Sequence, residues 1–249
     1  MPSTRERLDA LLVRRGLARS REQARGLILA GEVLVGGRKA DKAGTAVAGD
    51  AEIRLLAAPS PFVSRGGEKL AGALDHFGID PAGLACVDVG ISTGGFTDCL
   101  LRRGARTVYG IDVGYGQVAL ALRDDSRVTL FERTNVRHFD PATLPERADL
   151  AVVDVSFISL TLVLSIVKEL VHAGGTVLAL VKPQFEVGKG EVGKGGVVRD
   201  PAKHEAAIAK VEALAASIGL TPTGSVPSVL LGPKGNREFF VRLVRSSES

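Results

Sequence analysis

From residue 84 onward, short apolar runs rich in β-branched residues alternate with stretches whose apolar residues recur at helical spacing. The runs predict buried strands, and the stretches between them predict helices. This alternation is typical of a parallel sheet with helices on both faces, so we expect a doubly wound α/β fold. The predicted strands cover 84–89, 107–113, 128–131, 150–153 and 176–181, and the predicted helices lie near 68–77, 96–103, 116–123, 159–172 and 202–218.

Two more strands are predicted after the last helix, near 222–230 and 237–244. The loop between them, Gly232-Pro-Lys-Gly-Asn236, is rich in turn-forming residues and suits an antiparallel hairpin. The methyltransferase variant of the doubly wound fold ends with a hairpin of this kind.

The first sixty residues follow a different pattern. Three leucines between Leu8 and Leu12 form one face of a short helix, and a capping box at Ser20 predicts the start of a second helix. Alternating valines lead to the turn at Gly36-Gly37, and a strand is predicted over 51–56. We therefore expect a small α+β domain in front of the larger one.

The positive charge of the chain is concentrated in this small domain. Residues 1–59 hold eleven Lys and Arg against seven Asp and Glu, a difference of +4 that equals the net charge of all 249 residues. Such an excess indicates either a polyanionic partner or a solvated basic helix face. Because Ala57-Ala-Pro-Ser-Pro61 has the composition of a linker, we predict domains at 1–59 and 65–249 joined by a linker at 60–64.

Several classes of protein are excluded by the rest of the composition. Two cysteines and four scattered histidines provide neither a disulfide framework nor the spacing of metal ligands, so we expect no metal. The most apolar stretch, 159–181, is interrupted by charged residues and a glycine pair, and the chain starts without the apolar core of a signal peptide. We therefore expect a cytoplasmic protein.

A glycine loop follows the first strand of the large domain and opens a helix, as a nucleotide-binding loop does. Its spacing, G-x-x-x-G-G, places Ser92 where a pyrophosphate-binding loop needs glycine, which disfavours NAD and FAD. S-adenosylmethionine has no pyrophosphate, and Asp88 is placed to attract its ammonium group directly or through water. The predicted cofactor loop comprises Asp88, Gly90, Ser92, Thr93, Gly94 and Gly95; an ordinary strand-to-helix turn is the alternative.

The strands that follow supply further polar residues at their carboxyl ends. Asp112, about twenty residues after the glycine loop, is placed to bind the ribose hydroxyls of an adenosine. Asn135 and Val136 are candidates for the adenine, although an asparagine in a loop is often only a turn former.

Candidate catalytic residues lie at the same edge of the sheet. Asp154 ends the fourth strand and Lys182 ends the fifth, beside the expected cofactor crevice. A buried ammonium loses hydration unless it is paired, which favours the neutral amine and suits a base. A lysine that merely extends to solvent is the alternative for Lys182 alone. Lys69 and Glu238 complete the order Lys-Asp-Lys-Glu.

This order, the glycine loop and the sequence Lys182-Pro-Gln resemble the ribose 2′-O-methyltransferases of the FtsJ-like superfamily. The run from Arg7-Leu-Asp to Gly37 resembles the RNA-binding module of ribosomal protein S four. From about residue 5 to 244, the chain resembles the TlyA (haemolysin A) family of rRNA 2′-O-methyltransferases. The stretches SRGGEKL, DVGISTGGFTDCLL, DVSFISL and LVKPQFEVG make this resemblance specific.

The resemblance implies a Rossmann-like S-adenosylmethionine-dependent methyltransferase domain with a small N-terminal α+β RNA-binding domain. It implies methylation of cytidine ribose in assembled ribosomal subunits. Lys182 would orient the 2′-hydroxyl and help to remove its proton, near the positive Lys69 and the sulfonium. Asp154 would position Lys182, and Glu238 would hold Lys69 or the ribose.

The resemblance implies that the basic residues of the small domain contact phosphate groups. They would recognise mainly the shape and the backbone of the RNA. Lys189 and Lys194 lie in a glycine-rich segment after the fifth strand, which is either a mobile flap over the RNA or a plain loop. The other RNA-binding candidates are Arg5, Arg7, Arg14, Arg15, Arg19, Arg21, Arg25, Arg38 and Lys39.

Two other functions compete with this hypothesis. A non-enzymatic RNA- or ribosome-binding protein has no need for two lysines and two acids at one crevice. A membrane-damaging protein requires an apolar or amphipathic span, and the sequence offers none. Because the substrate is large, we expect a monomer.

Overall fold

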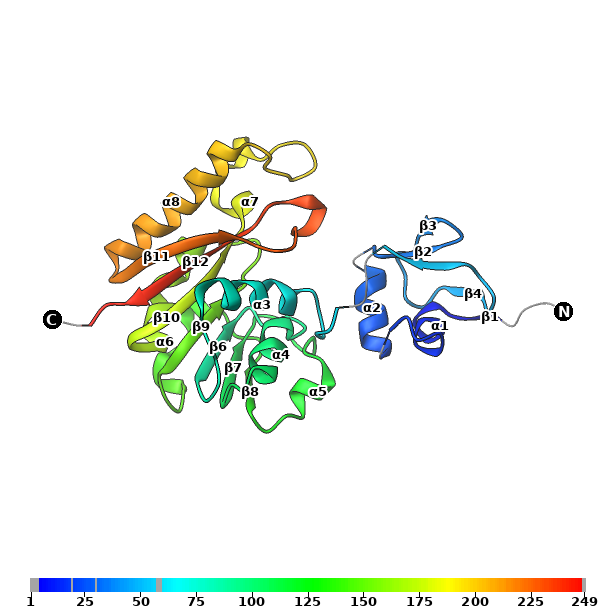
Figure 1. Cartoon of the computed structure of the whole chain (residues 1–249), viewed down its shortest axis with the longest axis horizontal. Coiled ribbons are helices and arrows are strands. Elements are labelled where there is room, and N and C mark those ends of the chain that lie inside the picture. Colours follow the sequence, from blue (N-terminus) through cyan, green and yellow to red (C-terminus); the bar gives the residue numbers. More distant parts are fainter. Residues whose placement is uncertain (1–4, 19, 30, 57–59, 248–249) are drawn as a thin grey trace. The chain divides into compact units, whose positions relative to one another are not determined.

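The computed structural model describes residues 5–18, 20–29, 31–56 and 60–247. The chain divides into two compact units, Met1–Ser64 and Arg65–Ser249 (Figure 1). Unit 1 contains the elements β1 (Arg5–Arg7), α1 (Leu8–Arg14), α2 (Arg21–Leu29), β2 (Val33–Val35), β3 (Arg38–Lys39), β4 (Ala46–Ala48) and β5 (Ile53–Leu55).

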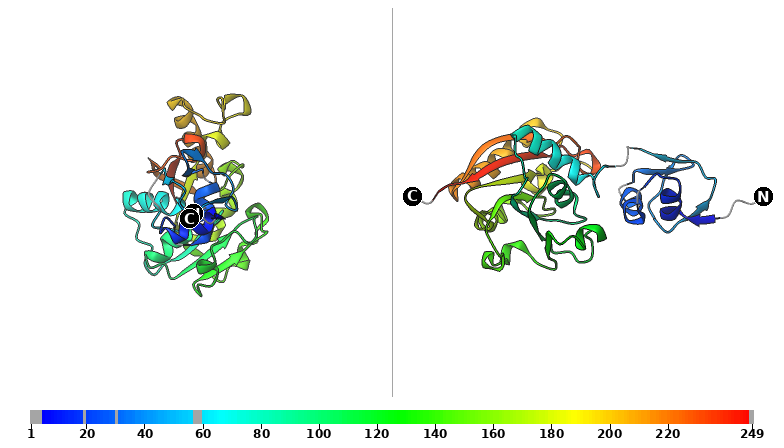
Figure 2. Two further views of the ribbon diagram at one scale, coloured as in Figure 1. Left: turned by 90° about the vertical axis from the view of Figure 1, so that its right-hand side faces the viewer. Right: turned by 60° about the horizontal axis from the view of Figure 1, so that its bottom comes forward.

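The two helices of unit 1 pack on each other and on the short strands (Figure 2). Leu8 and Leu12 of α1 and Ile28 of α2 are completely buried in this core, as the leucine spacing predicted. Strand β2 pairs with β3 and β5 in a three-stranded antiparallel sheet. The ribbon of β1 and β4 was not predicted, because three polar or small residues at each strand leave no alternating pattern.

Unit 2 contains the larger set of elements. Its strands are β6 (Ala85–Val89), β7 (Thr107–Ile111), β8 (Val128–Phe131), β9 (Ala148–Val153), β10 (Val171–Val181), β11 (Leu220–Pro227) and β12 (Phe239–Arg245). Its helices are α3 (Gly66–Phe77), α4 (Gly95–Arg102), α5 (Leu120–Arg123), α6 (Leu164–Leu170), α7 (Pro183–Glu186) and α8 (Pro201–Ser217), with short 3₁₀ turns η1 (Val136–His138), η2 (Pro141–Thr143), η3 (Leu160–Leu162), η4 (Lys189–Glu191) and η5 (Pro233–Gly235).

The seven strands of unit 2 form one sheet in the order β11-β12-β10-β9-β6-β7-β8. Strands β6 to β10 run parallel, and β12 lies antiparallel between β10 and β11. Helices α3 and α4 cover one face, and α6 and α8 cover the other (Figure 1, Figure 2). This confirms the predicted Rossmann-like sheet that ends in an antiparallel hairpin.

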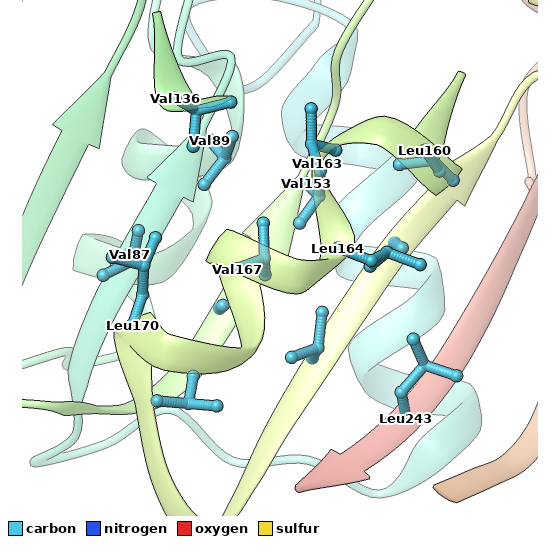
Figure 3. Packing of buried hydrophobic residues seen from close by; sticks show 14 of the residues in the cluster. Val87, Val89, Val136, Val153, Leu160, Val163, Leu164, Val167, Leu170 and Leu243 are labelled. Atoms are coloured by element: carbon cyan, nitrogen blue, oxygen red, sulfur yellow. The ribbon is translucent and has the colours of Figure 1, made fainter. Parts of the chain in front are cut away.

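The main core of unit 2 lies between the sheet and α6 and α8. Val87 and Val89 of β6 and Val153 of β9 face Leu164 and Val167 of α6 (Figure 3). All five side chains are at most 1% exposed, so the apolar runs identified in the sequence are the central strands of this sheet.

Some boundaries differ from the prediction. Helix α6 ends at Leu170, and β10 starts at Val171 rather than at 176, with a shift of register before Thr176. The glycine pair that broke the helical pattern lies in this irregularity, where Gly174 has a φ of +82°. Residues 57–59 of the predicted linker region lie outside the described residues. In the remainder, the Ser60 hydroxyl donates to the Ser64 carbonyl.

Candidate active site

A pocket opens at the carboxyl edge of the sheet of unit 2, with a volume of about 550 Å³. Ligand sites in doubly wound sheets lie at this edge, because the loops that follow parallel strands converge there. The pocket is lined by Val89, Gly90, Ser92, Ile111, Asp112, Val113, Gly114, Gln117, Thr134, Asn135, Val136, Asp154, Val155, Ser156, Phe157, Ile158 and Val163.

The glycine loop brings its own backbone close to the backbone at the end of β9. Gly90 has a φ of +87°, and a Cβ atom there would lie 2.6 Å from the carbonyl oxygen of Asp154. Only glycine fits at this position. Gly90 and Ser92 line the pocket, whereas Thr93, Gly94 and Gly95 do not; Gly94 is the N-cap residue of α4.

Asp112 connects two loops of the pocket wall. Its carboxylate accepts the backbone N–H groups of Ser92, at 2.8 Å, and of Gly114, at 2.7 Å. Because a carboxylate oxygen has two lone pairs, each oxygen retains the capacity to accept one further hydrogen bond. Asn135 caps η1 by accepting the Arg137 N–H, and both Asn135 and Val136 line the pocket.

Asp88 is completely buried and is not a lining residue. Its Oδ2 accepts a hydrogen bond of 2.7 Å from the Thr97 hydroxyl, and its Oδ1 has no hydrogen-bond partner among the described residues. Burial raises the pKa of Asp88 to about 7, and the nearby carboxylates of Asp154 and Asp112 act in the same direction. Three carboxylates thus lie in or behind one pocket wall, which favours a cationic ligand.

Replacing Asp88 by asparagine should stabilise the protein more at pH 8 than at pH 5. Because the pKa of Asp88 is about 7 in the folded protein and about 4 in an unfolded chain, the folded state binds this proton more tightly. The stability that the group contributes is present at acid pH and is lost as the pH rises from about 4 through 7.

Melting temperatures measured from pH 5 to 8 without cofactor would check this. The difference in melting temperature between Asp88→Asn and wild type should grow with pH. The exposed change Asp124→Asn should show no such trend. A gain that is independent of pH would contradict the expectation.

Lys182 is buried and paired rather than extended into solvent. Its side chain is 9% exposed, and its Nζ lies 2.6 Å from Asp154 Oδ1 and donates to the Ser156 hydroxyl at 2.7 Å. The two partners come from the loop after β9, beside β10 in the sheet. Ser156 was missed as a site residue, because a serine three residues beyond the end of a strand carries no sequence signal of its own.

Lys69 and Glu238 form the second ion pair. Lys69 Nζ on α3 lies 2.6 Å from Glu238 Oε2, and both side chains are nearly inaccessible to solvent. Glu238 directly precedes β12, and the register that pairs Val181 with Phe239 continues to place Lys182 opposite Glu238. Both ion pairs therefore lie at one edge of the sheet.

Gly232 makes room for the Glu238 carboxylate, since any Cβ atom at that position would overlap Oε1. Glu238 Oε1 is buried and has no hydrogen-bond partner among the described residues. One oxygen of this carboxylate thus holds Lys69, and the other is left for a further donor.

Two buried polar residues that the sequence analysis did not single out hold the surrounding loops. Glu186 accepts the backbone N–H of Leu160 at 2.7 Å and a hydrogen bond from Ser159, so it ties the loop after β9 to α7. Asn236 accepts the Val198 N–H at 3.0 Å and donates to the Gly196 carbonyl at 2.9 Å. The glycine-rich segment is therefore anchored at its C-terminal end, beside Glu238.

The basic candidates for RNA binding that the structure describes fall into three groups. Arg14 is paired with Glu6, and Arg15 donates to the carbonyl groups of Gly49 and Ala51, so both arginines brace the fold. Arg7, Arg21 and Arg25 bind one buried carboxylate, and Arg5, Arg38, Lys39 and Lys194 are exposed. Arg19 and the side chain of Lys189 lie outside the described residues.

Within the described ranges, no helix is both long and apolar enough to cross a membrane. The same residues contain no group of three or more histidine, cysteine or acidic side chains that would hold a metal ion.

The sheet order, the glycine loop and the pocket at the carboxyl edge, with Asp112 and Asp154 in its wall, define a Rossmann-like methyltransferase. Comparison with known families agrees, since the FtsJ-like methyltransferase family matches residues 62–245 and the S4 domain matches residues 6–53.

Relatives match nearly the whole chain. The 16S/23S rRNA (cytidine-2′-O)-methyltransferase TlyA of Mycobacterium tuberculosis is 49% identical over 240 residues, covering 96% of this chain and 90% of that protein. Hemolysin A of Brachyspira hyodysenteriae is 36% identical, covering 96% and 99%. A solved structure from Streptococcus thermophilus, described as a hemolysin, has a TM-score of 0.77 and 39% identity, covering 98% and 90%.

The chain therefore belongs to the TlyA family of rRNA 2′-O-methyltransferases, which the sequence motifs indicated. A more distant structure, N-methyltransferase NodS from Bradyrhizobium japonicum with S-adenosyl-l-homocysteine, shares the fold at a TM-score of 0.50 and 16% identity, covering 74% and 86%.

Proposed function

We propose that this chain transfers a methyl group from S-adenosylmethionine to the ribose 2′-hydroxyl of cytidine in rRNA. The observation that carries the proposal is the presence of two buried ion pairs, Lys182–Asp154 and Lys69–Glu238, at the carboxyl edge of the sheet. Asp154 lines the pocket, whereas Lys69, Lys182 and Glu238 are not among its lining residues. The relative from Mycobacterium tuberculosis acts on cytidine in 16S and 23S rRNA, and a relative from Campylobacter jejuni acts on 23S rRNA.

The pocket residues fit S-adenosylmethionine, which when bound supplies a methyl group activated by a positive sulfonium. Gly90 allows close approach of backbone, and the carboxylates of Asp88, Asp112 and Asp154 favour a cation. The remaining lone pairs of Asp112 suit ribose hydroxyls, and Asn135 and Val136 would lie beside the adenine. Asp88 would act through water or through its charge, since its side chain is buried behind the wall.

Lys182 would orient the hydroxyl that is methylated. An ammonium has three N–H groups, of which the Ser156 hydroxyl accepts one. Asp154 Oδ1 lies 2.6 Å from Nζ as an ion-pair partner but accepts no hydrogen bond from it, so the ammonium keeps donors for a substrate hydroxyl. To act as a base the ammonium must first give up one proton to solvent; the lone pair of the amine can then accept the hydroxyl proton as methyl transfer proceeds, which restores the ammonium. Since displacement at carbon requires collinear attack, holding the hydroxyl in line supplies much of the acceleration.

The second ion pair would hold the ribose on its other side. Glu238 fixes the Lys69 ammonium through Oε2, and its Oε1 can accept a hydrogen bond from the substrate. Both groups are buried, so their interactions with a bound ribose are screened only weakly by water.

Phe157 offers an apolar surface for the substrate beside these groups. It lines the pocket, is 91% exposed and has its ring centroid 5.2 Å from that of Phe185. Single-stranded or flipped-out nucleotides commonly stack on exposed aromatic rings, so we propose that this surface receives a base of the RNA.

Replacing Ser156 by alanine should lower kcat about tenfold and change the affinities for cofactor and RNA much less. The change removes the hydroxyl that accepts a hydrogen bond from Lys182 and helps to orient it, at a cost of roughly 1.4 kcal/mol in the transition state. Single-turnover methylation together with cofactor titration would measure the two effects. Ser165→Ala, an exposed change on α6, is the control; a Ser156 variant with wild-type kcat would contradict the role.

The two units have separate parts in this proposal. Residues 1–59 bind rRNA, residues 65–249 carry the methyltransferase, and residues 60–64 join them. The substrate is rRNA in assembled ribosomal subunits, and the protein acts in the cytoplasm as a monomer, without a metal ion. The match of residues 6–53 to the S4 domain and the basic excess of this unit support the assignment of rRNA binding to residues 1–59.

The test is transfer of radiolabelled methyl from S-adenosylmethionine to purified small and large ribosomal subunits that lack the modification. We expect label in rRNA, located at the 2′-oxygen of cytidine by nuclease digestion and mass spectrometry. Label on a base, or binding of subunits without any transfer, would overturn the proposal, and the second result would favour a non-enzymatic RNA-binding protein.

A further inference from the structure

Unit 1 contains one acidic side chain on which three arginines converge. Asp9, in the first turn of α1, has a completely inaccessible side chain. Arg7 of β1 binds it through Nη2 at 2.9 Å and through Nε at 3.0 Å. From α2, Arg21 contributes Nη2 at 3.1 Å and Arg25 contributes Nε at 3.3 Å.

The charges of this cluster do not balance. One carboxylate faces three guanidinium groups, so the cluster has a net charge of +2. These cations strongly favour the ionised form, and hydrogen bonding from Arg7 foremost holds the pKa of Asp9 far below its usual range. A carboxylate that served only to neutralise buried charge would not need three partners, each about half exposed.

The three arginines also keep N–H groups that Asp9 does not use and that can donate to a ligand. A guanidinium has five N–H groups, and Asp9 uses two from Arg7, one from Arg21 and one from Arg25. The shared carboxylate fixes the three planar groups side by side, although they come from two separate elements. Planar guanidinium groups that are held in this way match the oxygens of phosphate groups.

We propose that Asp9 is a positioning residue that assembles Arg7, Arg21 and Arg25 into a single site for the phosphate backbone of rRNA. The inference rests on the proposed function of unit 1 in RNA binding. Ordering the arginines before RNA arrives reduces the side-chain entropy that is lost on binding, and it fixes the spacing of the contacted phosphates.

This proposal and simple electrostatics predict opposite results for removal of the Asp9 charge. An Asp9→Asn variant gains one unit of positive charge, which by long-range attraction alone should tighten binding to a polyanion. If Asp9 instead orders the three arginines, the same change should weaken binding, since asparagine has one acceptor oxygen in place of two and, in either orientation of its amide, its NH₂ group faces at least one guanidinium N–H.

The experiment measures binding of the full chain to unmodified ribosomal subunits, without cofactor, over a range of salt concentrations. Asp50→Asn is the matched control, because it makes the same charge change at an exposed position of the same unit. We expect Asp9→Asn to bind about tenfold more weakly than wild type, and Asp50→Asn to bind equally or slightly more tightly. Equal affinities of the two variants would overturn the proposal.

A second variant avoids any unfolding caused by a change at a buried position. Arg25→Lys keeps the charge at a site that is half exposed, but it loses the planar fork. We expect about threefold weaker binding, and wild-type affinity would overturn the proposal. Because binding is measured without methyl transfer, failure of the proposed enzymatic activity leaves this result interpretable.

Discussion

Replacing Lys182 by alanine should reduce methyl transfer by about 10³-fold while leaving the affinity for S-adenosylmethionine nearly unchanged. The change removes the group that faces the substrate hydroxyl, and general-base and orienting groups commonly contribute 10² to 10⁴ in rate. It also leaves Asp154 without its cation, but the glycine loop and Asp112 do not contact Lys182. Single-turnover assays and calorimetric titration of the cofactor would separate the two quantities.

Two controls make the result specific to the position of the amine. Lys182→Arg retains the charge but replaces a compact ammonium by a planar guanidinium that cannot act as a base, so it should be nearly as inactive as alanine. Lys168→Ala, a change of a lysine on α6 beside Glu169, should leave the rate unchanged. Substantial turnover by Lys182→Ala would refute the assigned role.

Replacing Gly90 by alanine should destabilise unit 2 by about 3 kcal/mol and lower cofactor affinity about 100-fold. The alanine Cβ would meet the backbone carbonyl of Asp154, which has no rotamer to move into, so the glycine loop or β9 must shift. Either shift displaces Asp154 and the pocket wall. The cofactor site and the Lys182–Asp154 ion pair both depend on these positions.

Gly83→Ala separates steric overlap from backbone strain. Gly83 also has a positive φ, of +76°, but no atom lies within 4 Å of the place that its Cβ would occupy. Its replacement should cost only about 1 kcal/mol and leave the pocket intact. Thermal unfolding and cofactor titration of the two variants would measure the difference. Equal losses of stability and of cofactor affinity would contradict the expectation that close packing at Gly90 shapes the cofactor site.

The fold could be predicted well because its central strands are buried on both faces. Residues 150–153 form an uninterrupted apolar run, and residues 84–89 form one that only Asp88 interrupts; such runs are typical of parallel strands that are buried on both faces. The start of β10 was predicted five residues late, because Val171 continues the apolar pattern of α6 and the glycine pair resembles a loop. The pairing of β10 with β9 through an irregular register decides this boundary, and the sequence of β10 alone does not show such pairing.

The site residues that could be predicted are those at strand ends. Asp112, Asp154 and Lys182 follow apolar runs, and parallel strands bring such positions together. Ser156 and Glu186 could not be predicted, since their partners are fixed by the course of two loops.

Charge patterns gave a similarly incomplete account of unit 1. Arg14 and Arg15 look like any other surface arginines in the sequence, yet both bind groups within their own unit. Asp9 looks like an ordinary acid in the first turn of a helix, and only the folded structure gives it three cationic partners.

The position of β12 has a consequence for the order of events during protein synthesis. It follows every other strand in the chain but lies inside the sheet, and Glu238 directly precedes it. Because a chain emerges from its N-terminus, Lys69 and Lys182 leave the ribosome before the partner of Lys69 has been made. A nascent chain in which β12 has not yet been made therefore has an open edge at β10 and a Lys69 without its carboxylate partner.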